Sequence, residues 1–382
     1  MPNYTQLAYL IVNLLFKLFV ESGATLHKLD LYFRNYEINP EIFYSLEQNE
    51  QFFSRLQSLS LGVTSHFNID SATRLLRILA KTTTKLSALN LGRFYSDNGP
   101  QLFKILLCII KSQEKIRQFT LVGECLAEFH GIISALEIQR NSLQEIKLEH
   151  CDYSAEFDIL KDCNNLEILR IRYCDMKLLK ILNDKVNTLE IVDFQIDATP
   201  IVQILEKSGT LLKRLILAST DREIWKEYLL LGALKSFCPN ITYLKISNIG
   251  FSVQLIELIG NLQKLQFLTL WCNDFITEEL KTRVIQFAKT LPLTLQYLDL
   301  WDNLLELYID IFLNHCNAPL NKLIIYHLDN EKISKALIDF CIRNKTLNYV
   351  GVDRYFKLDD DIRKEVEKYV SLVPYERVVV NC

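Results

Sequence analysis

The 382-residue sequence is poor in glycine and proline, with 11 and 8 residues respectively. Together these 19 residues are about 5% of the chain, whereas an average protein has roughly 12%. Flexible linkers between domains use both residues heavily, so we expect one continuous body. The hydrophobic content of 49% is high enough to build a large core, which excludes a disordered, collagen-like or mucin-like chain.

The sequence also lacks an excess of charge of either sign. Its 43 lysine and arginine residues nearly balance its 46 aspartate and glutamate residues, which leaves a formal charge of −3. A protein that binds the nucleic-acid backbone needs a concentrated positive field, so we expect no nucleic-acid partner.

The apolar run at the N-terminus, from Leu7 to Val20, is interrupted by Asn13 and Lys17. It is shorter than the ~20 residues that span a bilayer, and it lacks the basic segment and cleavage site of a signal peptide. We therefore expect no membrane partner and a cytoplasmic location, with a nuclear location as the alternative.

Motifs for catalysis and metal binding are missing as well. The ten cysteines include no Cys-x-x-Cys pair, so they are expected to be mostly buried thiols rather than zinc ligands or disulfides. The sequence contains no HExxH, GxSxG, GxxxxGK(S/T) or GxGxxG motif. His150 and Cys151 are adjacent, but neighbouring strand residues point to opposite faces, so they should not meet as base and nucleophile. We predict a protein that is not an enzyme, with no catalytic residue, no cofactor and no metal.

Leucine, in contrast, fills 66 of the 382 positions, and much of it recurs with a period. The pattern apolar-x-x-apolar-x-apolar occurs thirteen times with a mean spacing of about 27 residues, which lies in the range of leucine-rich repeats. The first residues of these cores are Leu26, Leu56, Leu86, Ile116, Leu143, Leu166, Val186, Leu212, Ile241, Leu265, Leu295, Leu320 and Leu347.

Each core predicts a short strand, and the amphipathic stretches between cores predict helices. The expected fold is α/β: a leucine-rich-repeat solenoid of about 13 repeats, curved like a horseshoe, with parallel strands on the concave face and helices on the convex face. We expect the solenoid at residues 26–353, an N-terminal capping helix within residues 1–25, and a C-terminal capping helix and tail at residues 354–382. The C-terminal helix is expected to run from Asp359–Asp361 to about Val373, with an edge strand at Arg377–Val380.

The segment Cys238–Ile246, CPNITYLKI, resembles the CPNLxxLxL unit of the cysteine-containing, ribonuclease-inhibitor-like repeats of F-box/LRR proteins, and residues 162–166, DCNNL, are similar to a second copy. In that family a cysteine or asparagine follows each core after two residues. We expect such side chains to satisfy backbone groups in the turn that leaves the strand. Here the position is occupied by Cys151, Cys174, Asn273 and Asn303.

The resemblance covers roughly residues 26–353 and implies the substrate receptor of an SCF-type E3 ubiquitin ligase. In such a receptor an N-terminal F-box docks on the cullin adaptor, and the repeats hold the substrate. An F-box usually opens with a Leu-Pro-x-Glu element, which residues 1–25 do not contain. Three interpretations stay open: the start is truncated, the F-box has been lost, or the chain is an LRR scaffold or inhibitor unconnected to ubiquitin.

Aromatic residues gather on the open side of the last repeats. If the last two apolar residues of each core point toward the helices, the residues before, between and after them point away from the helices. In the last five repeats seven of these fifteen positions are aromatic, whereas aromatic residues make up 11% of the chain. We predict that these seven residues bind a protein partner: Tyr243, Phe267, Trp271, Tyr297, Trp301, Tyr326 and Tyr349.

Two interpretations of these aromatic residues remain. Trp and Tyr are enriched in the residues that dominate binding interfaces, which favours a protein-binding patch. The alternative is that neighbouring rings stack across strands and only stiffen the sheet. The middle repeats carry charges of both signs on the same face, which favours a specific protein partner over an anionic polymer. These residues are Glu145, Lys147, Glu149, Arg170, Arg172, Glu190 and Arg214.

Overall fold

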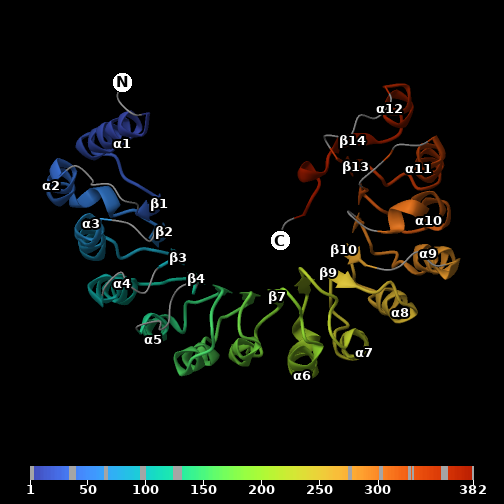
Figure 1. Cartoon of the computed structure of the whole chain (residues 1–382), viewed down its shortest axis with the longest axis horizontal. Coiled ribbons are helices and arrows are strands. Elements are labelled where there is room, and N and C mark those ends of the chain that lie inside the picture. The colour runs from blue at the N-terminus through green and yellow to red at the C-terminus, as the bar shows by residue number, and fades with distance from the viewer. Residues whose placement is uncertain are drawn as a thin grey trace. The chain divides into compact units, whose positions relative to one another are not determined.

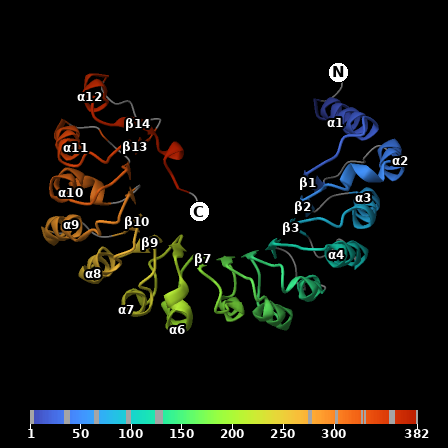
Figure 2. The same cartoon turned by 180° about the vertical axis from the view of Figure 1, so that it is seen from behind.

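The structure is a computed structural model that describes residues 4–33, 40–63, 68–94, 100–123, 131–273, 278–300, 304–325, 328, 331–353 and 360–380. The chain divides into two compact units, Met1–Lys185 (unit 1) and Val186–Cys382 (unit 2). In each unit parallel strands alternate with helices, and the strands follow one another in the order of the chain (Figure 1, Figure 2).

In unit 1, the described strands are β1 (Lys28–Phe33), β2 (Ser58–Val63), β3 (Ala88–Arg93), β4 (Gln118–Val122), β5 (Glu145–Glu149) and β6 (Ile168–Arg172). The α-helices are α1 (Tyr4–Glu21), α2 (Pro40–Gln48), α3 (Ile69–Thr82), α4 (Pro100–Ser112) and α5 (Ile132–Ala135). Short 3-10 helices are η1 (Glu50–Phe53), η3 (Leu136–Gln139), η4 (Ala155–Asp162) and η5 (Met176–Ile181).

In unit 2, the described strands are β7 (Thr188–Asp193), β8 (Arg214–Ser219), β9 (Tyr243–Ile249), β10 (Phe267–Cys272), β11 (Tyr297–Asp299), β12 (Lys322–Ile324), β13 (Tyr349–Val352) and β14 (Ser371–Pro374). The α-helices are α6 (Ala198–Ser208), α7 (Glu227–Phe237), α8 (Val253–Asn261), α9 (Glu278–Thr290), α10 (Ile309–His315), α11 (Glu331–Arg343) and α12 (Asp360–Val366). The 3-10 helices are η6 (Gly209–Leu211), η7 (Leu304–Tyr308) and η8 (Tyr375–Arg377).

All thirteen predicted cores form strands, β1 to β13, because their apolar residues stack in register. Between β2 and β3, Leu59 pairs with Leu89 and Leu61 with Leu91, and all four side chains are buried. Since alternate strand residues share a face, both leucine columns lie on the helix side of the strands. The fold is the predicted α/β leucine-rich-repeat solenoid.

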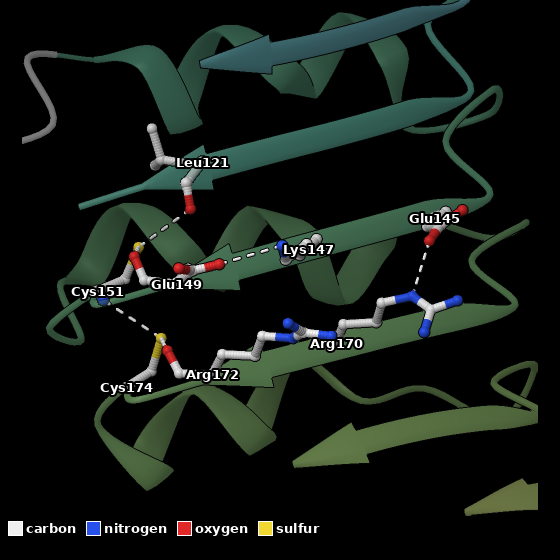
Figure 3. A network of polar contacts seen from close by, with 8 residues as sticks. All are labelled: Leu121, Glu145, Lys147, Glu149, Cys151, Arg170, Arg172 and Cys174. Carbon is white, nitrogen blue, oxygen red and sulfur yellow. Dashed lines mark hydrogen bonds and ion pairs between the residues drawn. The ribbon is translucent and has the colours of Figure 1, made fainter. Parts of the chain in front are cut away.

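The cysteines that follow two of the cores bind backbone groups, as predicted (Figure 3). The Cys151 backbone N–H donates to Cys174 Sγ at 3.2 Å, and Cys174 Sγ donates to the Arg172 carbonyl at 3.1 Å. Cys151 Sγ lies 3.8 Å from the Leu121 carbonyl oxygen. The hydrogen bond with Cys174 and burial both raise the pKa of the Cys151 thiol. These thiols therefore act as neutral links between successive turns.

Asparagines fill the same role in unit 2. Asn273 donates through Nδ2 to Asn248 Oδ1, and Asn248 donates through Nδ2 to the Ser219 carbonyl at 2.7 Å. The Asn273 side chain thus bonds to a second asparagine side chain instead of directly to the backbone, and that second side chain, Asn248, bonds to the backbone. Asn303 lies outside the described residues.

Two buried glutamines form a second ladder, where the chain enters the strands of unit 1. Gln139 Oε1 accepts from the Ile116 backbone N–H at 3.0 Å, and Gln139 Nε2 donates to the Gln113 carbonyl at 2.9 Å. Gln113 repeats this arrangement one turn earlier, with the Leu86 N–H and the Thr83 carbonyl. Glutamine is usually a surface residue, so the sequence alone did not indicate this ladder.

Helix α1 forms where the N-terminal capping helix was expected. The ring of Phe16 packs edge-on against Phe52 with 5.6 Å between centroids, and Asn49 Nδ2 donates to the Val20 carbonyl. None of the helices in the part of the chain that the structure describes is long and apolar enough to cross a membrane.

The prediction for residues 360–380 was wrong in two respects. Helix α12 ends at Val366 instead of about Val373, and the edge strand is Ser371–Pro374 instead of Arg377–Val380. The register of β14 on β13 shows a degenerate fourteenth core in which Leu372 pairs with Val350 and Pro374 with Val352. Because proline occupies the last core position, this repeat does not match the pattern apolar-x-x-apolar-x-apolar. Asp359 lies outside the described residues.

The glutamine ladder predicts that Gln139→Ala lowers the free energy of unfolding by about 1–3 kcal/mol, because it leaves the buried Ile116 N–H and Gln113 carbonyl unpaired. The matched control is Gln118→Ala, since Gln118 is exposed on β4 and should change stability by less than about 0.5 kcal/mol. Urea denaturation followed by circular dichroism measures both. Equal effects of the two substitutions would contradict the role of the ladder.

The burial of most described cysteines predicts that a thiol reagent labels the folded protein selectively at exposed cysteines. Of the described cysteines Cys108 is exposed, and the buried thiols are Cys151, Cys163, Cys174, Cys238, Cys272, Cys316 and Cys341. Burial raises the pKa of Cys163 to about 11 and that of Cys238 to about 12, so neither thiolate is populated at neutral pH. In a chain with Cys125→Ser and Cys382→Ser, mass spectrometry should find a thiol reagent on Cys108 alone at pH 7, and on the buried thiols after denaturation. Rapid native labelling of Cys238 would contradict this burial.

Candidate protein-binding surface

Three of the predicted aromatic residues form a row across neighbouring strands of unit 2. Tyr243 on β9 pairs in register with Phe267 on β10, which pairs with Tyr297 on β11. The ring centroids are 6.2 Å apart between Tyr243 and Phe267 and 6.0 Å apart between Phe267 and Tyr297. We call these three residues the aromatic row. Contacts between its rings agree with the stacking interpretation.

The aromatic row is largely covered, although it lies on the strand face. Tyr243 is 4% exposed and Tyr297 is 1% exposed. Residues 375–380, which we call the C-terminal tail, provide part of this cover. Val378 packs with Tyr297 and Ile324 in one buried cluster, against which Phe267, Val379 and Val380 also pack. The sequence does not indicate this cover, because the run of valines in Arg377–Val380 predicts an edge strand.

Burial changes the titration of the two tyrosines. Burial raises the pKa of Tyr297, the negative charge of Asp299 raises it further, and a backbone hydrogen bond with Val380 acts in the opposite direction. Burial also raises the pKa of Tyr243, while the Arg214 guanidinium, 4.9 Å from the centre of its ring, opposes the shift. Both hydroxyl groups are therefore neutral at physiological pH.

Two further predicted residues expose their rings beside the aromatic row. Trp271 on β10 is 38% exposed, and Tyr349 on β13 is 44% exposed. Trp301 and Tyr326 lie outside the described residues. The structure thus places three of the seven predicted residues together and two more on strands of the same unit.

Four of the charged residues of β5 and β6 in unit 1 form two ion pairs (Figure 3). Arg170 Nε lies 2.9 Å from Glu145 Oε1, and Lys147 Nζ lies 3.1 Å from Glu149 Oε2. All four side chains are half-buried, so each pair offsets part of the cost of removing its charges from water. At these four positions the charges of opposite sign form local ion pairs.

A second exposed aromatic group, which the sequence did not indicate, lies in unit 2, with Phe194 and Trp225 in loops and Tyr228 in the first turn of α7. Phe194, Trp225 and Tyr228 each expose more than half of their surface. Lys226 has a left-handed backbone with φ of 56° and places Nζ 4.1 Å from the centre of the Trp225 ring. Hydrophobic runs identify cores, whereas isolated aromatic residues outside those runs give no such signal.

His150 and Cys151 do not act on each other in the contacts that the structure describes. The His150 ring stacks on Tyr173 with 5.0 Å between centroids, and both residues have a positive φ. The raised pKa of Cys151 disfavours its thiolate. Among the described residues there is no cluster of three histidine, cysteine, aspartate or glutamate residues that could hold a metal ion.

Comparison with known proteins gives remote structural likenesses only. No protein-family model and no curated protein matches the sequence. A chain of the yeast Rad7 and Elc1 complex is 15% identical, with 96% of this chain and 85% of that chain covered and a TM-score of 0.47. The leucine-rich-repeat protein LegL7 from Legionella pneumophila is 14% identical, with 70% and 89% covered and a TM-score of 0.41. A Bacteroides fragilis protein is 18% identical, with 61% and 65% covered and a TM-score of 0.37.

The buried hydroxyl of Tyr297 predicts a loss of stability at alkaline pH. Because its pKa in the folded protein is raised above the ordinary value of 10.0, the unfolded chain releases this proton first. The contribution of the protonated Tyr297 hydroxyl to the free energy of unfolding is complete below about pH 10 and is lost as the pH rises further. Between about pH 9 and 11 the free energy of unfolding should therefore fall more steeply in the wild type than in Tyr297→Phe. Urea denaturation at several pH values measures this slope, and Tyr349→Phe, at an exposed ring, should keep the wild-type slope.

Proposed function

We propose that this chain is a non-catalytic protein-binding module, and that the strand face of unit 2 holds the partner. The observation that carries the proposal is the pair of exposed residues, Trp271 on β10 and Tyr349 on β13, on the same strand face of unit 2 as the covered aromatic row. Tryptophan and tyrosine bury a large rigid surface with little loss of side-chain entropy, which makes them effective anchors in interfaces. The leucine columns fix the strand backbones, so these rings are held in a defined pattern.

In the finer form of the proposal, the chain is the substrate-recognition part of an SCF-type ubiquitin ligase. The support is the likeness of Cys238–Ile246 to the repeat unit of F-box/LRR proteins. In this form the strand face of unit 2 holds the substrate, and a separate region contacts the cullin adaptor. The alternative is an LRR scaffold or inhibitor that binds the same kind of partner without any ubiquitin-ligase component.

The test compares Trp271→Ala with Trp225→Ala, because both residues are partly exposed tryptophans of unit 2 and only Trp271 lies on the strand face. Affinity purification with quantitative mass spectrometry should recover a stoichiometric partner with the wild type and with Trp225→Ala. Recovery with Trp271→Ala should fall by about tenfold or more, as expected for an interface residue worth at least about 1.4 kcal/mol.

Equal recovery with both variants contradicts the assignment of the strand face. If a cullin adaptor is also recovered and its amount is unchanged by Trp271→Ala, the ligase form of the proposal is supported. If the partner is recovered without any ubiquitin-ligase component, the scaffold or inhibitor form holds.

A further inference from the structure

The C-terminal tail leaves the edge strand on the side opposite the helices. After β14 the chain forms η8 over β13 and then continues on the strand side of unit 2, where its last described residues lie (Figure 1). In the earlier repeats of this unit each strand is followed by a helix, which lies on the face of the sheet opposite the tail. The tail therefore departs from the repeat and lies on the face that we propose for partner binding.

The tail begins with a close contact that depends on a glycine. Gly351 lies on β13, and a Cβ atom at this position would be only 3.1 Å from the Cα of Tyr375 and 3.1 Å from Ile324 Cγ1. Both distances are shorter than ordinary van der Waals contacts, so a side chain here would push the tail away from the sheet. The absence of a side chain at Gly351 leaves room for the tail backbone.

The middle of the tail is held by apolar contact. Val378 is 2% exposed and packs with Tyr297 and Ile324. Val379 and Val380 are half-buried against the same cluster. A run of β-branched aliphatic side chains thus fills the surface beside the aromatic row.

The end of the tail is held through its backbone. The Tyr243 hydroxyl donates to the Val380 carbonyl oxygen in a long hydrogen bond of 3.5 Å, and the Val380 backbone also bonds with Tyr297. Recognition of a peptide by side-chain contacts at some positions and backbone hydrogen bonds at others is typical of peptide-binding grooves.

The reach of the tail exceeds what a terminal cap requires. A cap covers the apolar surface that the last repeat leaves exposed, which here belongs to β13 and β14. The tail instead extends back to Tyr243 on β9, four strands before β13 in the sheet. Its contacts are with the strand face rather than with the core between strands and helices.

We propose that the C-terminal tail is an internal competitor for the aromatic row, and that the partner presents a short segment of consecutive β-branched aliphatic residues that takes its place. This inference rests on the proposed function and adds the chemistry of the partner and a form of autoinhibition. Trp271 and Tyr349 are accessible to the partner at once, whereas Tyr243, Phe267 and Tyr297 become accessible when the tail leaves.

The covalent link makes the tail an effective competitor. Only Tyr375–Arg377 separate β14 from Val378, and short links give effective concentrations in the millimolar range or above. A weak intrinsic contact is then enough to keep the row covered, and a partner must bind more tightly to displace it.

The test uses the full chain and a fluorescent peptide with the sequence of residues 375–380, Tyr-Glu-Arg-Val-Val-Val, blocked at both ends. Val378→Glu places a charge in the apolar contact and should release the tail. Fluorescence polarisation should show the peptide binding to Val378→Glu at least about 30-fold more tightly than to the wild type, a ratio that corresponds to about 2 kcal/mol. The matched control is Val253→Glu, the same change at an exposed position of α8, which should bind like the wild type.

Two further controls locate the binding site. Adding Phe267→Ala to Val378→Glu should abolish most of the gain, because it removes the central ring of the aromatic row. A peptide with Asp in place of Val378 should bind neither protein. In the affinity purification described above, Val378→Glu should increase recovery of the partner that depends on Trp271.

The inference is overturned if Val378→Glu does not bind the peptide, or if the wild type binds it equally well. If Val378→Glu lacks a cooperative unfolding transition, Val378→Thr is measured instead; it keeps the shape of valine, and the buried hydroxyl should still give several-fold tighter peptide binding than the wild type. The peptide result does not depend on Trp271, so a failure of the tail inference is distinguishable from a failure of the proposed function.

Discussion

The in-register stacking of the two leucine columns is the constraint on which the other features depend. The second and third core residues of every strand point toward the helices only in this register, because a shift by one residue would turn them to the other face. That requirement fixes which residues face away from the helices, and so it fixes the aromatic row. It also places equivalent turns above one another, which makes the ladders of Cys151 and Cys174 and of Gln113 and Gln139 possible.

The polar ladders solve a problem that the leucine columns create. In each repeat the backbone of the turns before and after the strand is buried where water cannot reach it. Each buried N–H and carbonyl in these turns therefore needs a hydrogen-bond partner. Cysteine, asparagine and glutamine side chains supply these partners between successive repeats. Their bonds run along the stack, in the same direction as the strand pairing, and therefore strengthen the contact between neighbours.

The repeats could be predicted from the sequence because a strand core of three apolar positions is a local pattern. The fourteenth strand could not, since Pro374 replaces an aliphatic residue and its assignment depends on pairing with β13. The position of Tyr243 and Tyr297 on the strand face was also predictable from alternation. Their burial was not, because it depends on Val378 and Val380, more than 75 positions further along the chain, and sequence periodicity carries no information about such contacts.

The edge strand β14 has a consequence for the solubility of the chain. An exposed edge of a parallel sheet presents free backbone groups on which a strand of another molecule can add, and repeated addition produces fibrous aggregates. β14 is only four residues long and ends in Pro374, which has no N–H to donate, and the chain then turns away from the direction of the sheet at η8. Among the described strands, the sheet thus ends in a form that is a poor template for the addition of another strand.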